Sequence, residues 1–410
     1  MDEWKEYRLG DIITISSGFP YKGEFIGCGD NYILGMGCVS YKETFLPSGM
    51  RSYSSNSPER YLAYPGDIVL ATRQQSDNMP ILGMPAIIPN SCSGKNLIIG
   101  ANLYKVQNNS EFSNSFLFWL LKSPTYVQHI KSCQTGSTVR MITKANIENF
   151  YFYAPQKEER NKISNFLWNI ERKIELNRQI NDNLEQQAQA LFKSWFVDFE
   201  PFKDSEFVDS ELGMIPKGWR VFPIKEIAKF SQGTQVPIEN QYDTCGNNMI
   251  RFIRIVDYTS NNTEPPRYII SDNNQTYCSA DDIVMVRYGN IGKIGRRLSG
   301  VIANNLFKIL PIKFITSNFL YYFFNQDVIQ KFIIASAAGS AMPAIKHSTI
   351  GNIYIAIPPQ SIIESFDKLC SSVEEIILKN LKENDSLISL RDTLLPRLMS
   401  GELKINEINC

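Results

Sequence analysis

The chain has 410 residues, of which 43% are hydrophobic and 20% charged, and its 42 basic and 42 acidic side chains give no net charge. This length exceeds what one ordinary core fills and predicts two or three globular domains. Zero net charge argues against a protein that coats nucleic acid indiscriminately. It permits a DNA reader whose basic residues gather on one face.

The eight cysteines form no CxxC pair and no other short paired spacing. A zinc ribbon needs two close ligand pairs, and a disulfide framework is unusual in a chain this long. We therefore expect reduced thiols, no metal site and a cytoplasmic location. No apolar run reaches the roughly 18 residues that cross a bilayer, and the N-terminus lacks a secretion signal, so no membrane association is expected.

Residues 1–155 are predicted to form a mixed α/β head. Short β-rich runs such as Asp67–Leu70 lie between glycine- and proline-containing turns. A buried helix is expected to start near Phe116, after serine and asparagine residues that can cap it. The alternation of side chains over Phe150–Pro155 predicts a last strand before the following helix.

Residues 156–203 are predicted to form a long helix, because Glu158–Trp195 contains neither proline nor glycine. Its apolar residues follow alternating steps of four and three, which is a heptad pattern. Charged residues such as Glu171 fall off this seam and are expected to face solvent. The predicted seam comprises Ile163, Leu167, Ile170, Ile174, Asn177, Asn181 and Leu184.

Residues 204–358 repeat the first head. Gly66–Val69 matches Asp281–Val284, and Ser17-Gly18 matches Gln232-Gly233, at an offset of 215 residues; Asn102–Val106 then matches Asn305–Ile309 at an offset of 203. Two unrelated domains with similar turns are the alternative, but they would not keep one register over this length. We predict a duplicated α/β head.

Residues 359–410 are predicted to repeat the long helix, ending near Pro396. Its seam comprises Phe366, Val373, Ile377, Asn380, Asn384 and Leu387. Each seam has two central asparagines, which would meet midway if the helices paired antiparallel. We predict an intramolecular antiparallel coiled coil joining two heads with pseudo-twofold symmetry. The alternative is that each helix packs only on its own head.

No catalytic constellation is found. Pro265-Pro266 and Pro358-Pro359 lack the flanking Asp/Asn and aromatic residue that an amino-methyltransferase loop needs. There is no GxxxxGK[ST] and no GxGxxG after a strand. The two histidines, His129 and His347, lie in different copies, so little material exists for nucleophilic catalysis. The sequence favours a binding protein without catalytic residues.

Basic and polar loops recur at equivalent places in both copies. Arginine can bind guanine and glutamine can bind adenine by paired hydrogen bonds, and glycine lets backbone approach a phosphate. The alternative is a solvated loop with ordinary surface charges. The candidate DNA contacts are Arg73, Gln74, Gln75, Arg140 and Lys144 in the first copy, and Arg287, Tyr288, Lys293, Arg296, Arg297 and Lys346 in the second.

Several motifs, in order and partly doubled, resemble the specificity (S) subunit of type I restriction–modification systems, and the resemblance covers essentially the whole chain. They are Trp4-x-x-x-x-Leu9-Gly10-Asp11, Gly66-Asp67-Ile68-Val69, Pro155-x-x-x-x-Arg160-x-x-Ile163, Leu191-Phe192-Lys193-Ser194-Trp195-Phe196, Gly213-Met214-Ile215-Pro216-x-Gly218-Trp219 and the ending Leu394–Leu403.

The resemblance implies two target-recognition domains, each reading one half of a bipartite site on double-stranded DNA. It also implies that the helices are a spacer on which two modification (methyltransferase) subunits dock, with restriction (endonuclease) subunits joining them. S-adenosylmethionine, ATP and Mg²⁺ would belong to those partners. Two other interpretations stay open: a stand-alone methyltransferase or nuclease with its own recognition domains, and a structural coiled-coil adaptor.

Overall fold

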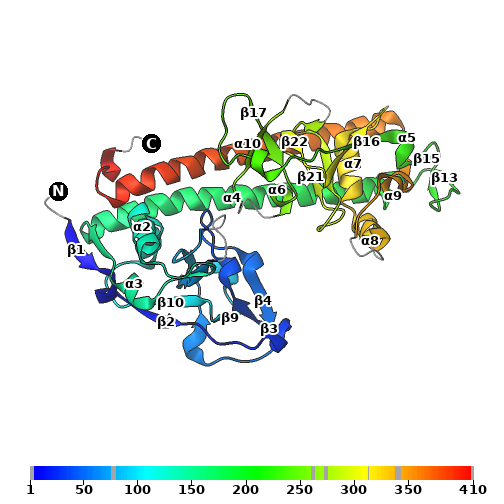
Figure 1. The fold of residues 1–410 in the computed structure, drawn as a ribbon. Coiled ribbons are helices and arrows are strands. Elements are labelled where there is room, and N and C mark those ends of the chain that lie inside the picture. Colours follow the sequence, from blue (N-terminus) through cyan, green and yellow to red (C-terminus); the bar gives the residue numbers. More distant parts are fainter. Residues whose placement is uncertain are drawn as a thin grey trace. The chain divides into compact units, whose positions relative to one another are not determined.

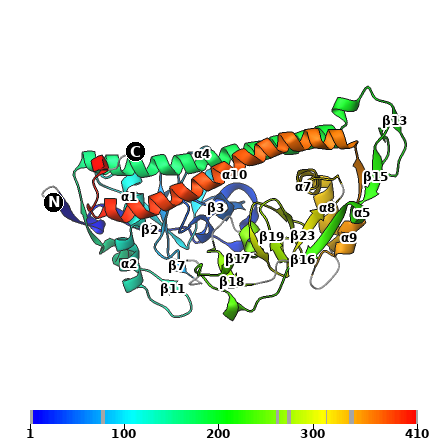
Figure 2. The ribbon, with the colours of Figure 1, turned by 90° about the horizontal axis from the view of Figure 1, so that it is seen from above.

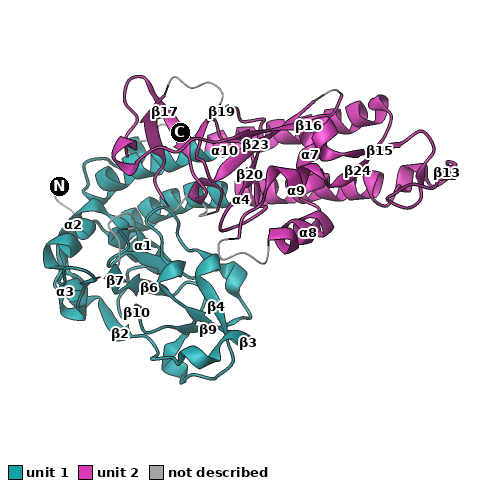
Figure 3. Cartoon of the chain, turned by 45° about the vertical axis from the view of Figure 1, so that its right-hand side comes forward, with its two compact units in different colours: residues 1–175, 384–410 teal, residues 176–383 magenta. Residues whose placement is uncertain are grey.

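The chain folds into two compact units, one formed by residues 1–175 with 384–410 and the other by residues 176–383 (Figure 3). The computed structural model describes residues 4–74, 80–259, 264–271, 276–312, 314–337 and 343–407. Each unit contains one globular head and one part of each of two long helices. The predicted mixed α/β class with two heads is confirmed.

The head of unit 1 is built on two four-stranded sheets (Figure 1). The first has the order β2 (Ile13–Ser17), β10 (Leu103–Asn108), β6 (Ile68–Ala71), β8 (Pro85–Ile87). The second has the order β4 (Met50–Tyr53), β3 (Ile26–Leu34), β9 (Asn96–Ile99), β5 (Leu62–Ala63). Two short ribbons pair β1 (Lys5–Arg8) with β12 (Tyr151–Ala154), and β7 (Arg73–Gln74) with β11 (Arg140–Met141).

Helices α1 (Asn114–Lys122), α2 (Pro124–Cys133) and α3 (Lys144–Glu148) complete this head. The Ser113 hydroxyl caps α1 by accepting a hydrogen bond from the Phe116 amide, as the sequence predicts. The predicted last strand is present as β12, whose side chains alternate between exposed and buried.

The head of unit 2 has the same two sheets in the same strand order. The first contains β16 (Ala228–Gln232), β23 (Leu306–Pro311), β20 (Ile283–Val286) and β21 (Ile294–Gly295). The second contains β18 (Arg267–Ile270), β17 (Met249–Ile253), β22 (Gly300–Ile302) and β19 (Tyr277–Cys278). The ribbon of β1 and β12 recurs as β15 (Arg220–Pro223) with β24 (Tyr354–Ile357).

The remaining elements of unit 2 are largely counterparts of those in unit 1. Helices α7, α8 and α9 repeat α1, α2 and α3, whereas the β13–β14 ribbon precedes the repeated part. These elements are α5 (Ile224–Ile227), α6 (Val256–Thr259), α7 (Ser317–Phe324), α8 (Asp327–Ala337), α9 (His347–Gly351), β13 (Phe207–Val208) and β14 (Ile215–Pro216).

Matched glycines explain part of the sequence repeat. The amide of Gly18 donates to the Leu103 carbonyl at 3.0 Å, and that of Gly233 donates to the Leu306 carbonyl at 3.0 Å. A Cβ at either glycine would lie 2.1 Å from a backbone oxygen, that of Gly100 for Gly18 and that of Ala303 for Gly233. Only glycine permits this approach. The two heads therefore share a packing constraint as well as a strand order, which confirms the duplication.

The two long helices are α4 (Lys157–Phe196) and α10 (Gln360–Met399). Helix α4 includes the whole proline- and glycine-free run Glu158–Trp195, but it ends at Phe196, before the end of the predicted segment 156–203. Helix α10 continues past Pro396, near which we expected it to end. Proline is tolerated in this last turn, where the Asp392 carbonyl loses its helical donor but few later hydrogen bonds remain to be made.

The helices pair antiparallel within each unit (Figure 2). In unit 1, Ile163 and Leu167 of α4 share a core cluster with Leu394 and Leu398 of α10. In unit 2, Phe192 of α4 meets Phe366 of α10, with ring centroids 5.7 Å apart. The same clusters include residues of the heads. The alternative, in which each helix packs only on its own head, is therefore wrong, because each helix packs on its partner helix as well as on a head.

The predicted seam is largely buried. Ile163, Leu167, Ile170, Ile174, Asn177, Asn181, Phe366, Ile377 and Asn384 are buried, and Leu184, Val373, Asn380 and Leu387 are partly buried. The Asn380 amide donates to the Asn181 side-chain oxygen at 2.8 Å, as antiparallel pairing predicts. The Asn177 amide instead donates to the Glu383 carboxylate at 2.8 Å.

Glu171 does not face solvent as expected. It is 6% exposed and forms an ion pair with Arg391 of α10 inside unit 1. The heptad pattern assigns one buried face to a helix, whereas the head covers a second face of α4.

Among the described residues, no helix combines the length and apolar character that a bilayer-spanning segment requires. Within the same residues, no group of three or more His, Cys, Asp or Glu side chains is placed to hold a metal ion. Seven described cysteines are free thiols.

Candidate nucleic-acid interface

The candidate interface begins where the central strand of each head leaves its first sheet. We call residues 72–74 of unit 1 and 287–289 of unit 2 the exit segments. Thr72 donates its amide to the Asn102 carbonyl at 3.1 Å, and its carbonyl accepts from Ile142 at 3.2 Å. Arg287 makes the same two contacts, with Asn305 at 2.9 Å and Ile345 at 3.2 Å. Both segments are thus fixed in the same way by the fold.

In unit 1 the exit segment pairs with β11, where Arg140 lies opposite Gln74 and Met141 opposite Arg73. Arg73 is exposed and Arg140 partly exposed. The Lys144 ammonium lies 5.8 Å from the centre of the Tyr104 ring. Burial raises the pKa of Tyr104, and the charge of nearby Arg73 opposes that rise. The structure therefore brings Arg73 and Lys144 together around Tyr104.

Gln74 requires a correction. Its side chain is 7% exposed, and its oxygen accepts a hydrogen bond from the Leu82 amide at 3.2 Å. A buried amide engaged in this way supports the turn after residue 80 and is not presented to a base edge. Gln75, the next candidate, lies outside the described residues.

In unit 2 the exit segment carries Arg287 and Tyr288. The Arg287 guanidinium lies 5.1 Å from the Tyr288 ring centre, and its Nη1 donates to the Gln232 side-chain oxygen at 3.5 Å. Tyr288 bridges to Ala344, which brings the start of α9 alongside. Lys346, at that start, and Lys293, in the turn after the exit segment, are both exposed. These four predicted residues therefore belong to one region.

Several buried polar atoms near Arg287 have no hydrogen-bond partner among the described residues: Arg287 Nε, Asn305 Oδ1 and His347 Nε2. Burial, and then the charge of Arg287, lower the pKa of His347, so its imidazole is neutral near pH 7. The His347 ring also stacks on Phe230 at 5.3 Å. Unsatisfied donors and acceptors of this kind are costly unless a ligand or water completes them.

The prediction that Arg296 and Arg297 contact DNA is corrected, because both side chains turn toward the long helices of unit 2 and not toward a DNA-facing loop. Arg296 is 9% exposed and pairs with Glu374 of α10 at 2.7 Å. Arg297 binds the same carboxylate at 2.7 Å and also pairs with Glu185 of α4. A run of basic residues without acids in sequence gave no sign of acids supplied by distant helices.

Sequence reasoning missed Tyr104 and Gln232, which position charged residues in the two exit regions. Gln232 holds Arg287 while its own amide donates to the Leu306 carbonyl at 3.1 Å. Both residues lie in segments that the repeat aligns, Asn102–Val106 and Gln232-Gly233. Their place in the repeat was therefore a usable signal, whereas their contacts were not visible in the sequence.

Comparisons with known proteins agree on one family. The family model described as "Type I restriction modification DNA specificity domain" matches residues 1–186 and 216–395, so it matches both copies. The chain is 29% identical to the type I restriction enzyme MjaIX specificity subunit of Methanocaldococcus jannaschii, covering 98% of this chain and 89% of that protein. It is 26% identical to the HindI specificity subunit of Haemophilus influenzae, covering 98% and 100%.

Among solved structures, the S subunit of a type I restriction–modification system from M. genitalium matches with a TM-score of 0.49 and 16% identity, covering 97% of this chain and 96% of that one. The family model covers most of this chain, in two separate stretches. The chain therefore belongs to the type I restriction–modification DNA specificity family.

Proposed function

We propose that this chain is the DNA sequence-specificity subunit of a type I restriction–modification complex. Each head would read one half of a bipartite site on double-stranded DNA. The proposal is supported by family membership and by the duplication of the exit segments. Basic residues stand at both: Arg73 and Lys144 in unit 1, and Arg287 and Lys346 in unit 2.

The observation that carries the proposal is the set of unsatisfied polar atoms at the exit segment of unit 2. Within the part of the chain that the structure describes, the buried Nε donor of Arg287 has no acceptor. A phosphate oxygen or the acceptor edge of guanine would complete it. Tyr288 and the exposed Lys346 supply further contacts to the DNA backbone.

The long helices, in this proposal, dock two modification subunits, and restriction subunits join that assembly. S-adenosylmethionine, ATP and Mg²⁺ would bind to those partners, which would carry out the adenine methylation and the DNA cleavage. The chain itself would contribute base recognition without catalysis. Its place of action would be the cytoplasm.

A gel-shift titration of the assembled complex tests the assignment of Arg287. Arg287→Ala is expected to weaken specific binding by about 1–3 kcal/mol and to relax selectivity in one half-site only. Arg220→Ala, an exposed arginine in β15 of the same unit, is the matched control and should bind as the wild type does. Equal affinities for wild type and Arg287→Ala would remove Arg287 from the interface.

Sequencing genomic methylation in cells that carry this chain and its modification subunits tests the function itself. A bipartite methylated motif is expected. Methylation of DNA by the purified chain alone with S-adenosylmethionine would support a stand-alone methyltransferase instead. If the complete complex binds DNA without sequence preference, the result would favour the interpretation of the chain as a structural coiled-coil adaptor.

A further inference from the structure

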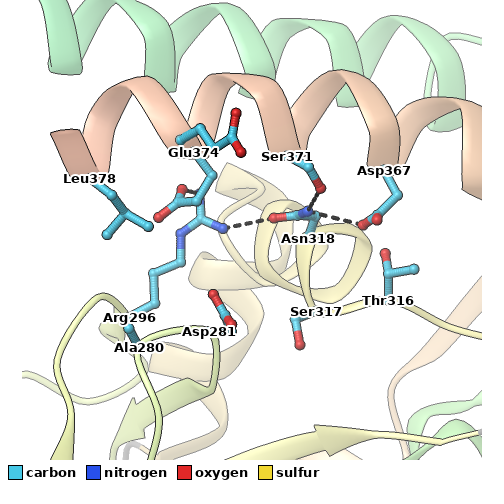
Figure 4. Close-up of a pocket in the computed structure, with 11 residues that line it drawn as sticks. Ala280, Asp281, Arg296, Thr316, Ser317, Asn318, Asp367, Ser371, Glu374 and Leu378 are labelled. Carbon is cyan, nitrogen blue, oxygen red and sulfur yellow. Dashed lines mark hydrogen bonds and ion pairs between the residues drawn. The ribbon is translucent and has the colours of Figure 1, made fainter.

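Unit 2 has a cavity of about 370 Å³ beside α10. Asp367, Ser371, Glu374, Glu375 and Leu378 line it from one face of the helix, as their spacing requires. The other wall comes from the head, with Arg296 and Asn318 directed toward the helix (Figure 4). The remaining lining residues are Ala280, Asp281, Thr316 and Ser317.

Each unit has a pair of aromatic residues where a long helix packs on the head, and the groups that cover these two pairs explain why this space is open. In unit 1, Trp168 of α4 covers Phe118 and Trp119, with ring centroids 5.4 and 5.5 Å apart. The repeat places Ser371 where Trp168 stands, at the offset of 203 residues.

In unit 2 the Arg296 guanidinium covers the equivalent pair, 3.8 Å from Tyr321 and 5.5 Å from Tyr322. A planar cation from the head thus replaces an indole from the helix. The small Ser371 side chain leaves the space above it unfilled.

The cavity is acidic. Its lining includes the carboxylates of Asp281, Asp367, Glu374 and Glu375, against one cation, Arg296. Glu374 is already paired with Arg296, and Asp367 accepts from the Asn318 amide at 2.9 Å. Asp281 and Glu375 are exposed. The remaining negative charge disfavours a DNA phosphate and favours a cation.

Arg296 also supplies a donor for a neutral acceptor. It is 9% exposed, and its Nε is buried without a hydrogen-bond partner among the described residues. A peptide segment that carries a basic side chain would satisfy both features, because its cation meets the carboxylates and a main-chain carbonyl meets the Arg296 Nε–H.

We propose that this cavity receives an arginine or lysine side chain of a protein partner, and that in unit 1 Trp168 fills the equivalent place. The proposal rests on the proposed function, in which the partners are the modification subunits. It makes the two docking sites unequal: the one at unit 2 depends on charge, and the one at unit 1 does not.

Binding of the purified modification subunit to the full chain tests this. Ser371→Trp introduces the residue of the other copy and fills the cavity. Asp281→Lys with Glu375→Lys reverses two exposed charges at its wall without removing a buried contact. Each is expected to weaken the second of two binding events by at least about tenfold, leaving the first unchanged.

Ser372→Trp is the matched control, since Ser372 is exposed, neighbours Ser371 and does not line the cavity. It should bind as the wild type does. Placing the photo-crosslinking residue p-benzoylphenylalanine at position 372, where the control predicts that a bulky side chain is tolerated, should yield a crosslink to a segment of the modification subunit containing arginine or lysine.

The outcomes separate the two claims. If the wild-type chain binds no modification subunit, the proposed function fails. If the wild type binds two while Ser371→Trp and the charge-reversed variant also bind two with unchanged affinity, only the cavity assignment fails. Equal losses in Ser371→Trp and Ser372→Trp, or a crosslink to DNA, would also overturn it.

Discussion

Glu171 of α4 and Glu374 of α10 occupy equivalent positions in the two units, and both bind arginine, but the arginines come from different places. In unit 1, Arg391 comes from the opposite helix and is 4% exposed. In unit 2, Arg296 and Arg297 come from the head. Unit 1 therefore uses this carboxylate to join helix to helix, and unit 2 uses it to join helix to head.

A second cation, Lys122, is present near the carboxylate of unit 1 and has no charged counterpart in unit 2. Lys122 of α1 donates to the Glu43 carbonyl at 2.8 Å and lies near Glu171 and Arg391. Its counterpart is Asn325, a neutral residue whose amide donates to the Tyr321 carbonyl at 2.9 Å. The comparison shows that a duplicated fold can keep one ion-paired carboxylate while the groups that neutralise it diverge.

Removing the arginine of unit 1 is expected to have the largest effect. Arg391→Leu leaves Glu171 buried without its cation, which should lower the free energy of unfolding by about 3–5 kcal/mol. Hydrogen exchange in peptides from residues 157–175 reports the loss locally. The double variant Glu171→Leu with Arg391→Leu should recover most of it, because neither member of the ion pair is then left without the other. A cost below about 1 kcal/mol for the single variant would show that the pair is dispensable.

The second largest effect is expected in the pH dependence of the free energy of unfolding, through a lysine of unit 1. Burial, and then the charge of Arg391, lower the pKa of Lys122 to about 8 from 10.5. Between these values the folded chain binds fewer protons than the unfolded chain. This group therefore makes the free energy of unfolding rise as pH increases from about 8 to about 10.5, by up to about 3 kcal/mol.

Urea titrations of the wild type and Lys122→Met across that pH range measure this rise as a difference between the two proteins. The charges that face Lys122 are Glu171, Asp392 and Arg391 on the helices and Glu43 in the head. Identical pH profiles for the two proteins would contradict the assignment. Asn325→Asp, at the counterpart in unit 2, should leave the profile over this range unchanged.

Glu374→Gln in unit 2 is expected to have the smallest effect, about 1–3 kcal/mol. Arg297 keeps its ion pair with Glu185, and Arg296 keeps hydrogen bonds to Asn318 at 2.9 Å and Tyr322 at 3.2 Å. Hydrogen exchange in peptides from residues 360–378 measures the loss. If Glu374→Gln lowers the free energy of unfolding more than Arg391→Leu does, the ion pair in unit 2 contributes more to stability than the one in unit 1, contrary to this prediction.

The architecture was predictable from the sequence because it depends on periodic and repeated patterns. The seams, the antiparallel pairing and the Asn181–Asn380 hydrogen bond follow from heptad spacing and from the equivalence of the two copies. The doubled heads follow from matched segments such as Gly18 and Gly233, whose close backbone contacts leave no room for a side chain.

The candidate site was only partly predictable, because charge in sequence does not reveal its partner in space. Arg287 and Arg297 look alike in a basic loop, yet one lies at the exit segment and the other binds Glu185 and Glu374. Glu171 was misplaced for the related reason that a heptad describes one helix face, and the head covers another.

Each compact unit contains a stretch of both long helices, α4 up to residue 175 with α10 from 384 in one, and the remainder in the other. Each repeat of the sequence therefore needs a helix segment of the other repeat to complete its compact unit. A protein fragment with only one repeat would contain one long helix without its partner helix, and apolar side chains such as Phe192 would be exposed. Such a fragment should recover the missing contacts by reciprocal exchange with a second molecule, so that truncation yields dimers in place of half-size monomers.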